Sequence, residues 1–232
     1  MRGPTFRERP MRFIPAMLLL AAPASTLAQD SVHEFRLGGS AEIVSEECIR
    51  LTPDAPYVSG SAWYEVPVDL SEPFEVRLSL MLGGKDENGA DGIVFVLHPN
   101  MTTGRGGEGM GFIGLAPSIG IEFDTYRNFH LDDPEADHLA LVLNGSAFHG
   151  DRSRLVELEN LEDRVRHPMR MVWNPGSGLR VFLDDTPRAF HPAELFGVVF
   201  DTRTVLYWGM TAGTGRLSNE QVICIEKLFL RM

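Results

Sequence analysis

No apolar run in the sequence is long enough to cross a bilayer as a helix, which takes roughly 20 predominantly apolar residues. The longest run, FIPAMLLLAAPA, covers only residues 13–24. It follows Arg2, Arg7, Arg9 and Arg12 and leads into the small-residue segment Thr26-Leu27-Ala28, a pattern typical of a secretory signal peptide. We therefore expect residues 1–28 to be a signal peptide and the protein to be secreted or periplasmic, without membrane insertion.

Basic residues are also scarce, because 21 Lys and Arg stand against 32 Asp and Glu, for a formal net charge of -11 at pH 7. A chain this acidic repels phosphate backbones and anionic lipid surfaces. We therefore exclude nucleic acid as a partner. Clustered carboxylates, in contrast, create sites for cations.

Cysteine is nearly absent as well, since Cys48 and Cys224 are the only two and allow at most one disulfide. Each lies in an apolar, strand-like run near one end of the expected mature chain. In an oxidising compartment a bridge between them would join the first part of the fold to the last. We predict this disulfide; the alternative is two separate buried thiols.

Strand patterns dominate from Ala41 onward, with short β-branched or aromatic runs between Gly, Pro, Asn and Asp turns. Residues 74–82, FEVRLSLML, alternate apolar and polar side chains, which predicts one buried and one wet face. Residues 92–98, GIVFVLH, are apolar throughout and predict a strand in the middle of a sheet. The other predicted strands are residues 41–44, 48–52, 138–144, 169–174, 179–184, 205–212 and 222–230.

The many short strands predict an all-β sandwich or barrel. After the signal peptide about 200 residues remain, a length typical of one large all-β domain, so we expect residues 29–232 to form a single domain. Helical spacing is found only in residues 152–166, RSRLVELENLEDRVR, where two short strands fit nearly as well. Two glycine-dense loops, residues 83–92 and 104–114, precede an acidic segment and suggest a shared site.

That acidic segment is GIEFDTYRNFHLDDPEADH, residues 120–138. In a strand, Glu122 and Asp124 project to the same face, where their charges repel unless a proton or a cation neutralises them. Asn128, Asp132 and Asp133 add oxygen ligands of the kind that Ca²⁺ prefers, and His138 adds an imidazole that suits a transition ion. The residue types therefore indicate two ions that share carboxylates.

These residues resemble the metal-binding segment of the legume-type (L-type) lectins. The similarity continues in ADGIVFVLHP (90–99), MGFIGL (110–115), HPMRMVWNPGSGLRVFLD (167–184) and WGMTAGTG (208–215). The blocks occur in the family's order over nearly the whole chain, which resembles an exported bacterial member. The resemblance implies a concanavalin-like jelly-roll β-sandwich of two antiparallel sheets that binds carbohydrate without catalysis.

The resemblance also implies residue roles. The ligands of a transition ion such as Mn²⁺ would be Glu122, Asp124, Asp133 and His138. The ligands of Ca²⁺ would be Asp124, Asn128, Asp133 and the carbonyl of Tyr126. The remaining acids, Asp132, Glu135 and Asp137, are expected to be solvated loop charges, and His98, His130, His149, His167 and His191 lack mutual metal spacing and are not expected to be ligands.

For the sugar, the resemblance implies that Asp91, after a cis Ala90-Asp91 peptide, accepts hydrogen bonds from hydroxyls. Gly111 would donate its backbone N–H, Asn128 its amide, and Tyr126 would offer an aromatic face. Gly215, Arg216 and Leu217 match the loop that varies specificity. These groups are complementary to a ring with adjacent hydroxyls and apolar C–H patches.

Two other functions compete with a lectin. A related β-sandwich glycoside hydrolase would carry its acid in an E-x-D-x-E pattern, but the third position here is Tyr126. A structural or adhesive sandwich with a degenerate sugar site is the other alternative, against which Asp91, Gly111 and Asn128 argue. The expected partners are glycans or glycoconjugates, and edge strands of a large sheet leave a homodimer open.

Overall fold

The computed structural model describes residues 1, 3, 31–150 and 153–229. The predicted signal peptide falls almost entirely outside the described residues, so it stays a prediction, as does the single-domain boundary. No helix in the described part of the chain has the length and apolar character needed to cross a membrane.

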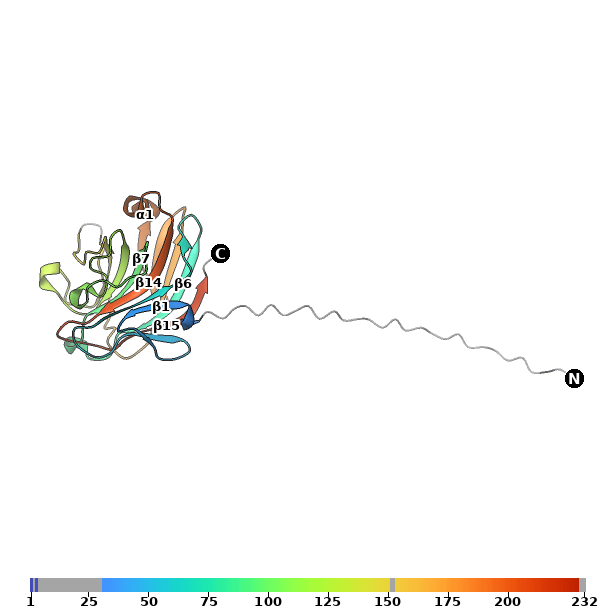
Figure 1. The fold of residues 1–232 in the computed structure, drawn as a ribbon, viewed down its shortest axis with the longest axis horizontal. Coiled ribbons are helices and arrows are strands. Elements are labelled where there is room, and N and C mark those ends of the chain that lie inside the picture. Colours follow the sequence, from blue (N-terminus) through green and yellow to red (C-terminus); the bar gives the residue numbers. More distant parts are fainter. Residues whose placement is uncertain (2, 4–30, 151–152, 230–232) are drawn as a thin grey trace.

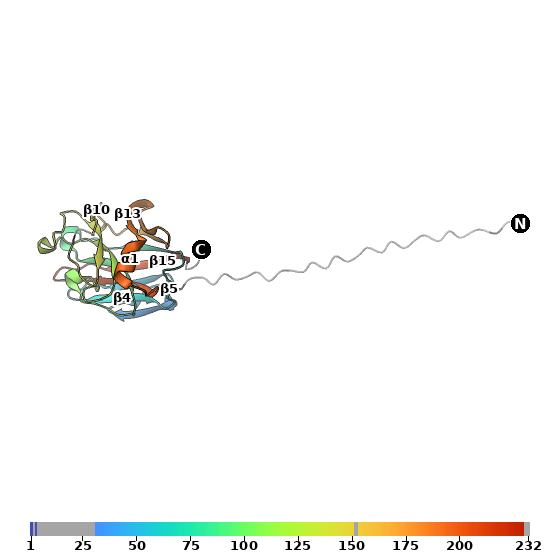
Figure 2. The same ribbon diagram turned by 90° about the horizontal axis from the view of Figure 1, so that it is seen from above.

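Two antiparallel sheets are stacked as layers (Figure 1 and Figure 2). In the first sheet the strand order is β1-β4-β14-β7-β8-β9-β10, with β5 paired to β14, and in the second it is β13-β12-β11-β6-β15-β3-β2. The first sheet consists of β1 (Phe35–Gly39), β4 (Ser59–Tyr64), β5 (Val68–Asp69), β7 (Gly92–His98), β8 (Ile119–Asp124), β9 (His138–Leu143), β10 (Val156–Glu157) and β14 (Val205–Gly213). The second consists of β2 (Glu42–Ile43), β3 (Cys48–Thr52), β6 (Phe74–Met81), β11 (His167–Asn174), β12 (Gly178–Leu183), β13 (Thr186–Pro192) and β15 (Gln221–Phe229).

In the described residues, helical structure is confined to short segments between strands and to one before β1. The 3-10 turns are η1 (Val32–Glu34), η2 (Asp86–Asn88), η3 (Gly107–Gly109) and η4 (Phe129–Leu131), and the α-helix is α1 (Ala193–Phe200). The expectation that helical spacing occurs only in residues 152–166 was wrong: the described part of that segment contains β10 and otherwise irregular chain. Helix α1 begins after Pro192 and packs Phe196 4.4 Å from the ring of Trp173, so tertiary packing stabilises a segment too short to form a helix alone.

The main core lies between the two sheets and is built by alternating residues. On β6 the side chains of Phe74, Val76, Leu78 and Leu80 are all at most 1% exposed, as the alternation predicted. Burying such a side chain contributes about 1.5–3 kcal/mol. The outer face of β6 is less exposed to solvent than expected, since Arg77 is the only exposed residue of the strand. The reason is that β6 lies in the middle of its sheet, between β11 and β15.

A second apolar cluster covers the outer face of the first sheet. Val94 and Val96 of β7 pack there with Val142, with Met110 and Phe112 of the glycine-dense loop, and with Leu115 directly after it. This explains why β7 is apolar on both faces, and it lies between β14 and β8 as predicted. Gly120 makes room for the cluster, since a Cβ there would stand 2.8 Å from both Val94 and Val142.

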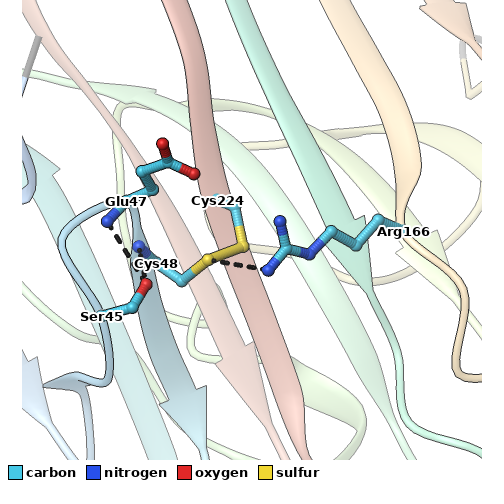
Figure 3. Close-up of a disulfide and its surroundings, with 5 residues drawn as sticks. All are labelled: Ser45, Glu47, Cys48, Arg166 and Cys224. Carbon is cyan, nitrogen blue, oxygen red and sulfur yellow. Dashed lines mark hydrogen bonds between the residues drawn. A yellow bond between two sulfur atoms is a disulfide. The ribbon is translucent and has the colours of Figure 1, made fainter.

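The two cysteines form a disulfide on the second sheet. Cys48 of β3 and Cys224 of β15 are cross-strand partners, and the structure contains the predicted bridge between them. Figure 3 shows Arg166 beside this disulfide, with Nη2 3.4 Å from the Sγ of Cys48. The bridge links segments 176 positions apart, so it closes most of the described chain into one covalent loop.

Candidate functional site

The predicted metal ligands lie on one face at one end of the first sheet. On β8, Ile121 and Phe123 point into the core, so Glu122 and Asp124 point outward, as the alternation required. The register of β8 and β9 places His138 directly opposite Asp124. The three strand residues are at most 2% exposed, although each side chain is polar or charged.

The loop between β8 and β9 adds Asp133 to this group. The N–H of Tyr126 donates to Asp124 Oδ1 over 2.8 Å, and the N–H of Asn128 donates to Asp133 Oδ2 over 2.6 Å. The loop then turns at Asp132, whose φ of 65° is left-handed. These backbone donors hold two carboxylates in place without neutralising them.

Two buried atoms in the group have no hydrogen-bond partner among the described residues: Asp133 Oδ1 and His138 Nε2. His138 Nε2 lies 4.0 Å from Asp133 Oδ1 and 3.9 Å from Glu122 Oε1. Donors that share an ion at about 2.0–2.2 Å stand no more than about 4.4 Å apart. The unpaired atoms and their spacing therefore fit a transition-metal ion.

The electrostatics of the cluster also favour a cation. Burial raises the pKa of Glu122, of Asp124 and of Asp133, and neighbouring carboxylates raise that of Asp124 further. Burial and the charge of His149 lower the pKa of His138 to about 4. This imidazole is therefore uncharged at pH 7 and can offer a nitrogen lone pair to a metal ion. Carboxylates that resist ionisation when alone are stabilised as anions by a bound metal ion.

Sequence reasoning set His149 aside, yet the structure places it in this cluster. Its Nε2 is hydrogen-bonded to Glu122 Oε1, and its ring meets that of His138 edge to face with centroids 5.1 Å apart. Burial lowers the pKa of His149, but the hydrogen bond and the charges of Glu122 and Asp133 outweigh it and the pKa is raised. The sequence carried no signal for this position, because the separation of His138 and His149 matches no metal-binding motif. Only the path of the loop after β9 brings His149 close to His138.

The solvated loop charges were predicted correctly at two positions of three. Asp132 and Glu135 are exposed. Asp137 is half-buried, its Oδ2 accepts the N–H of Leu161 over 2.7 Å, and burial raises its pKa to about 6. That prediction was wrong because the segment after β10 folds back over Asp137.

A cavity of about 520 Å³ opens beside the metal cluster. Its lining includes five residues that were expected to meet a sugar: Asp91, Tyr126, Asn128, Gly215 and Arg216. Leu217 also lines it, together with Tyr57 and Glu108, which sequence reasoning missed. Tyr57 is 76% exposed. The signal available in the sequence was an aromatic residue directly after the turn-forming residues Asp54-Ala55-Pro56. The volume suits a small ligand.

Asp91 is 3% exposed and its Oδ2 has no partner among the described residues. Its peptide with Ala90 is cis, as the resemblance implied. Burial, together with the charge of Glu108, raises the pKa of Asp91 to about 7, although the N–H of Gly215 opposes the shift. Asn128 Oδ1 is the other buried acceptor at the cavity without a described partner.

The loop that carries Asp91 is held from behind by the start of β15. Ala90 O accepts the N–H of Asn219 over 3.1 Å and Gln221 Nε2 over 3.2 Å. The Asn219 side chain in turn binds Glu162 and accepts the N–H of Gly84. These positioning residues escaped sequence reasoning because their contacts are distant along the chain.

Gly111 is not where the resemblance placed it. It does not line the cavity, and its N–H donates to Arg105 O over 2.8 Å. The chain turns away at Met110 and Gly111, whose φ angles of 46° and 71° are left-handed. Gly106 and Gly107 line the cavity instead, so the expected role of Gly111 has no support in the geometry.

Comparison with curated proteins gives partial matches. The chain is 34% identical over 102 residues to the pesticidal crystal protein Cry22Aa of Bacillus thuringiensis, covering 43% of this chain and 14% of that protein. It is 30% identical over 133 residues to the basic agglutinin of Psophocarpus tetragonolobus, covering 48% of this chain and 53% of the agglutinin. The chain thus spans less than two thirds of the length of these relatives.

Solved structures establish the fold. A lectin from Bauhinia forficata in complex with GalNAc superposes with a TM-score of 0.71 at 19% identity, covering 84% of this chain and 91% of that chain. The Ca²⁺/Man-bound exoplasmic/lumenal domain of VIP36 gives a TM-score of 0.66 at 21% identity, covering 86% and 84%. The predicted jelly-roll β-sandwich is thereby confirmed.

A sequence model of the family described as the legume lectin beta-barrel domain matches residues 27–227. This range contains the predicted metal ligands, the cavity and all the strands except the last two residues of β15. The match shows that the chain belongs to the legume-type (L-type) lectin family, whose members are non-catalytic carbohydrate-binding proteins.

Proposed function

We propose that the protein binds a glycan in the cavity beside Asp91 and that this binding requires calcium. The observation that carries the proposal is the pair of buried acceptors at the cavity, Asp91 Oδ2 and Asn128 Oδ1, which have no partner among the described residues. A buried acceptor without a partner costs free energy, and a sugar hydroxyl or an ion can supply the missing donor or charge.

Two ions would prepare this site. Ca²⁺ would take Asp124, Asn128, Asp133 and the carbonyl of Tyr126, and a transition ion would take Glu122, Asp124, Asp133 and His138. The bound ions would supply positive charge to carboxylates that burial otherwise disfavours as anions. Asn128 would then be fixed at the cavity and would present its amide to the ligand, which lowers the ordering cost of binding.

The remaining cavity groups complement a sugar. Tyr126 and Tyr57 offer aromatic surfaces, Asp91 a carboxylate, and Arg216 a set of donors at the exposed rim. The solved relatives are bound to different sugars, GalNAc in the Bauhinia lectin and mannose in VIP36. These relatives therefore do not indicate which class of monosaccharide this chain would bind. Export through a signal peptide to a secreted or periplasmic location fits a glycan ligand outside the cytoplasm.

A glycan array probed in calcium and again in EDTA tests the proposal. We expect binding to a limited set of glycans in calcium and its loss in EDTA, with recovery when Ca²⁺ is returned in excess. Equal binding under both conditions would contradict the role of calcium. Binding to no glycan in calcium would favour a structural or adhesive sandwich instead.

A further inference from the structure

The loop after β9 carries His149 back to the metal cluster. The chain reverses at Asn144 and Gly145, where Gly145 donates its N–H to Ser118 Oγ over 3.0 Å and φ is left-handed at both residues. It returns alongside β9, since the N–H of Leu141 donates to Ser153 O over 2.8 Å. His149 is thereby held over the outer face of β8 and β9.

The position of His149 gives it two carboxylates and a second imidazole as neighbours. Its side chain is 7% exposed, its Nε2 contacts Glu122 Oε1, and its Nδ1 lies 3.3 Å from Asp133 Oδ1. One donor atom each of Glu122, His138 and His149 can be chosen within 4.8 Å of one another. A shift of a few tenths of an ångström brings atoms at this spacing within the limit of about 4.4 Å for donors that share one ion.

A simple His149–Glu122 ion pair does not account for the surroundings. Three buried atoms converge there without hydrogen-bond partners among the described residues: His149 Nδ1, His138 Nε2 and Asp133 Oδ1. Two of them belong to residues whose side chains are at most 2% exposed. A single ion between these groups would satisfy atoms that the ion pair leaves unpaired.

We propose that His149 is a direct ligand of the transition-metal ion, in addition to Glu122, Asp124, Asp133 and His138, and that the resulting two-histidine set selects Zn²⁺ over Mn²⁺. The inference rests on the proposed function only in requiring that the metal centre exists. Imidazole suits Zn²⁺, whereas carboxylate and water suit Mn²⁺, so a second histidine changes the preferred ion. His149 is not among the proposed calcium ligands, all of which bind through oxygen.

The test counts imidazoles on the metal. The protein is stripped with chelator, saturated with Ca²⁺, and given one equivalent of Zn²⁺, and X-ray absorption at the zinc edge reports the coordinated histidines. We expect two imidazoles in the parent and one in His149→Gln. One imidazole in the parent would overturn the proposal, and this measurement needs no variant to fold.

Calorimetry of Zn²⁺ and Mn²⁺ binding provides the second readout. His149→Gln should lower Zn²⁺ affinity by about tenfold or more, since loss of even an outer partner of a metal ligand costs about 10–100-fold. Mn²⁺ affinity should change less, which reduces the preference for zinc. His33→Gln is the matched control, because it removes an exposed imidazole on η1 and should leave both affinities unchanged.

Calcium affinity and the melting temperature in calcium verify that His149→Gln is folded. A folded variant with the Zn²⁺ affinity of the parent would overturn the proposal. Glycan binding is measured independently: a parent that binds Zn²⁺ through two imidazoles but binds no glycan would contradict the proposed function and support the role of His149.

Discussion

Asp124 on β8 and His138 on β9 are cross-strand partners in the first sheet. Because directly opposed residues of antiparallel strands have Cβ atoms about 4.5–5.5 Å apart, the pairing alone brings a carboxylate and an imidazole within reach of one ion. The sheet thus sets the distance between these two predicted ligands, and the loop from Thr125 to Asp137 adds Asp133.

Replacing Asp91 with alanine should abolish or strongly weaken glycan binding. The variant removes the buried carboxylate at the cavity, and a hydrogen bond to a charged group contributes about 1.5–3 kcal/mol, or roughly 10–150-fold in affinity. Calorimetry with a glycan identified on the array measures the change. Glu87→Ala, an exposed carboxylate in the same loop, is the control and should bind as the parent does. Parent-like affinity in Asp91→Ala would remove Asp91 from the site.

Chelation should lower thermal stability together with glycan binding. Ions that bind only the folded state stabilise it by about 2.7 kcal/mol at 100 times their Kd. For a domain of this size that corresponds to a fall in melting temperature of roughly 5–10 °C when EDTA removes them. Scanning calorimetry with and without EDTA measures the shift. Identical melting temperatures would contradict occupied metal sites.

Glu162 should make stability fall as pH rises. Burial, and then the charges of Asp137 and Asp86, raise its pKa to about 8. Between its ordinary pKa of about 4.5 and pH 8 the folded state holds a proton that the unfolded state has lost, so the free energy of unfolding decreases across this range. In Glu162→Gln the free energy of unfolding should decrease less over this range. The stability of the variant relative to the parent should therefore rise as the pH approaches 8.

Melting temperatures from pH 5 to 9 in saturating calcium measure this effect. Glu159→Gln is the matched control, because Glu159 is exposed and paired with Arg188. Its pH profile should follow that of the parent near neutral pH. Parallel profiles for the parent and Glu162→Gln would show that Glu162 titrates at its ordinary pKa.

Loss of the disulfide should reduce stability without removing the sugar site. The bridge lies on the second sheet, whereas the metal ligands lie on the first, and removal of a native disulfide costs about 2–5 kcal/mol. Urea unfolding of the parent, with and without reductant, and of the Cys48→Ser/Cys224→Ser double variant should show this loss. The double variant should be insensitive to reductant. Two free thiols in the unreduced, unfolded parent would refute the bridge.

Much of the fold could be predicted because it depends on local alternation. The buried residues of β6 and the outward direction of Glu122 and Asp124 follow from a period of two, which needs no knowledge of neighbouring strands. Helix α1 escaped prediction because eight mostly apolar residues fit a strand as well as a helix. Its state is decided by packing against Trp173, which lies far away in the sequence.

The site residues likewise divide into those that could be predicted and those that could not. Glu122, Asp124, Asp133 and His138, which the resemblance implied as metal ligands, lie in one continuous segment. Gly111 and His149 depend on the three-dimensional path of glycine-rich loops, which residue types do not encode. Gly111 was therefore expected at the cavity but is absent from its lining, whereas His149 was not expected to be a ligand but lies in the metal cluster.

The contact between Ala90 and Gln221 implies an order of maturation. These residues are 131 positions apart, whereas the segment that holds the predicted metal ligands is short and continuous. A chain that leaves the ribosome or an export channel from its N-terminus therefore exposes the segment of the predicted metal ligands well before the residue that supports the Asp91 loop has emerged. Under the proposed function, the loop that carries Asp91 therefore gains this support only after Gln221, at the start of β15, has emerged.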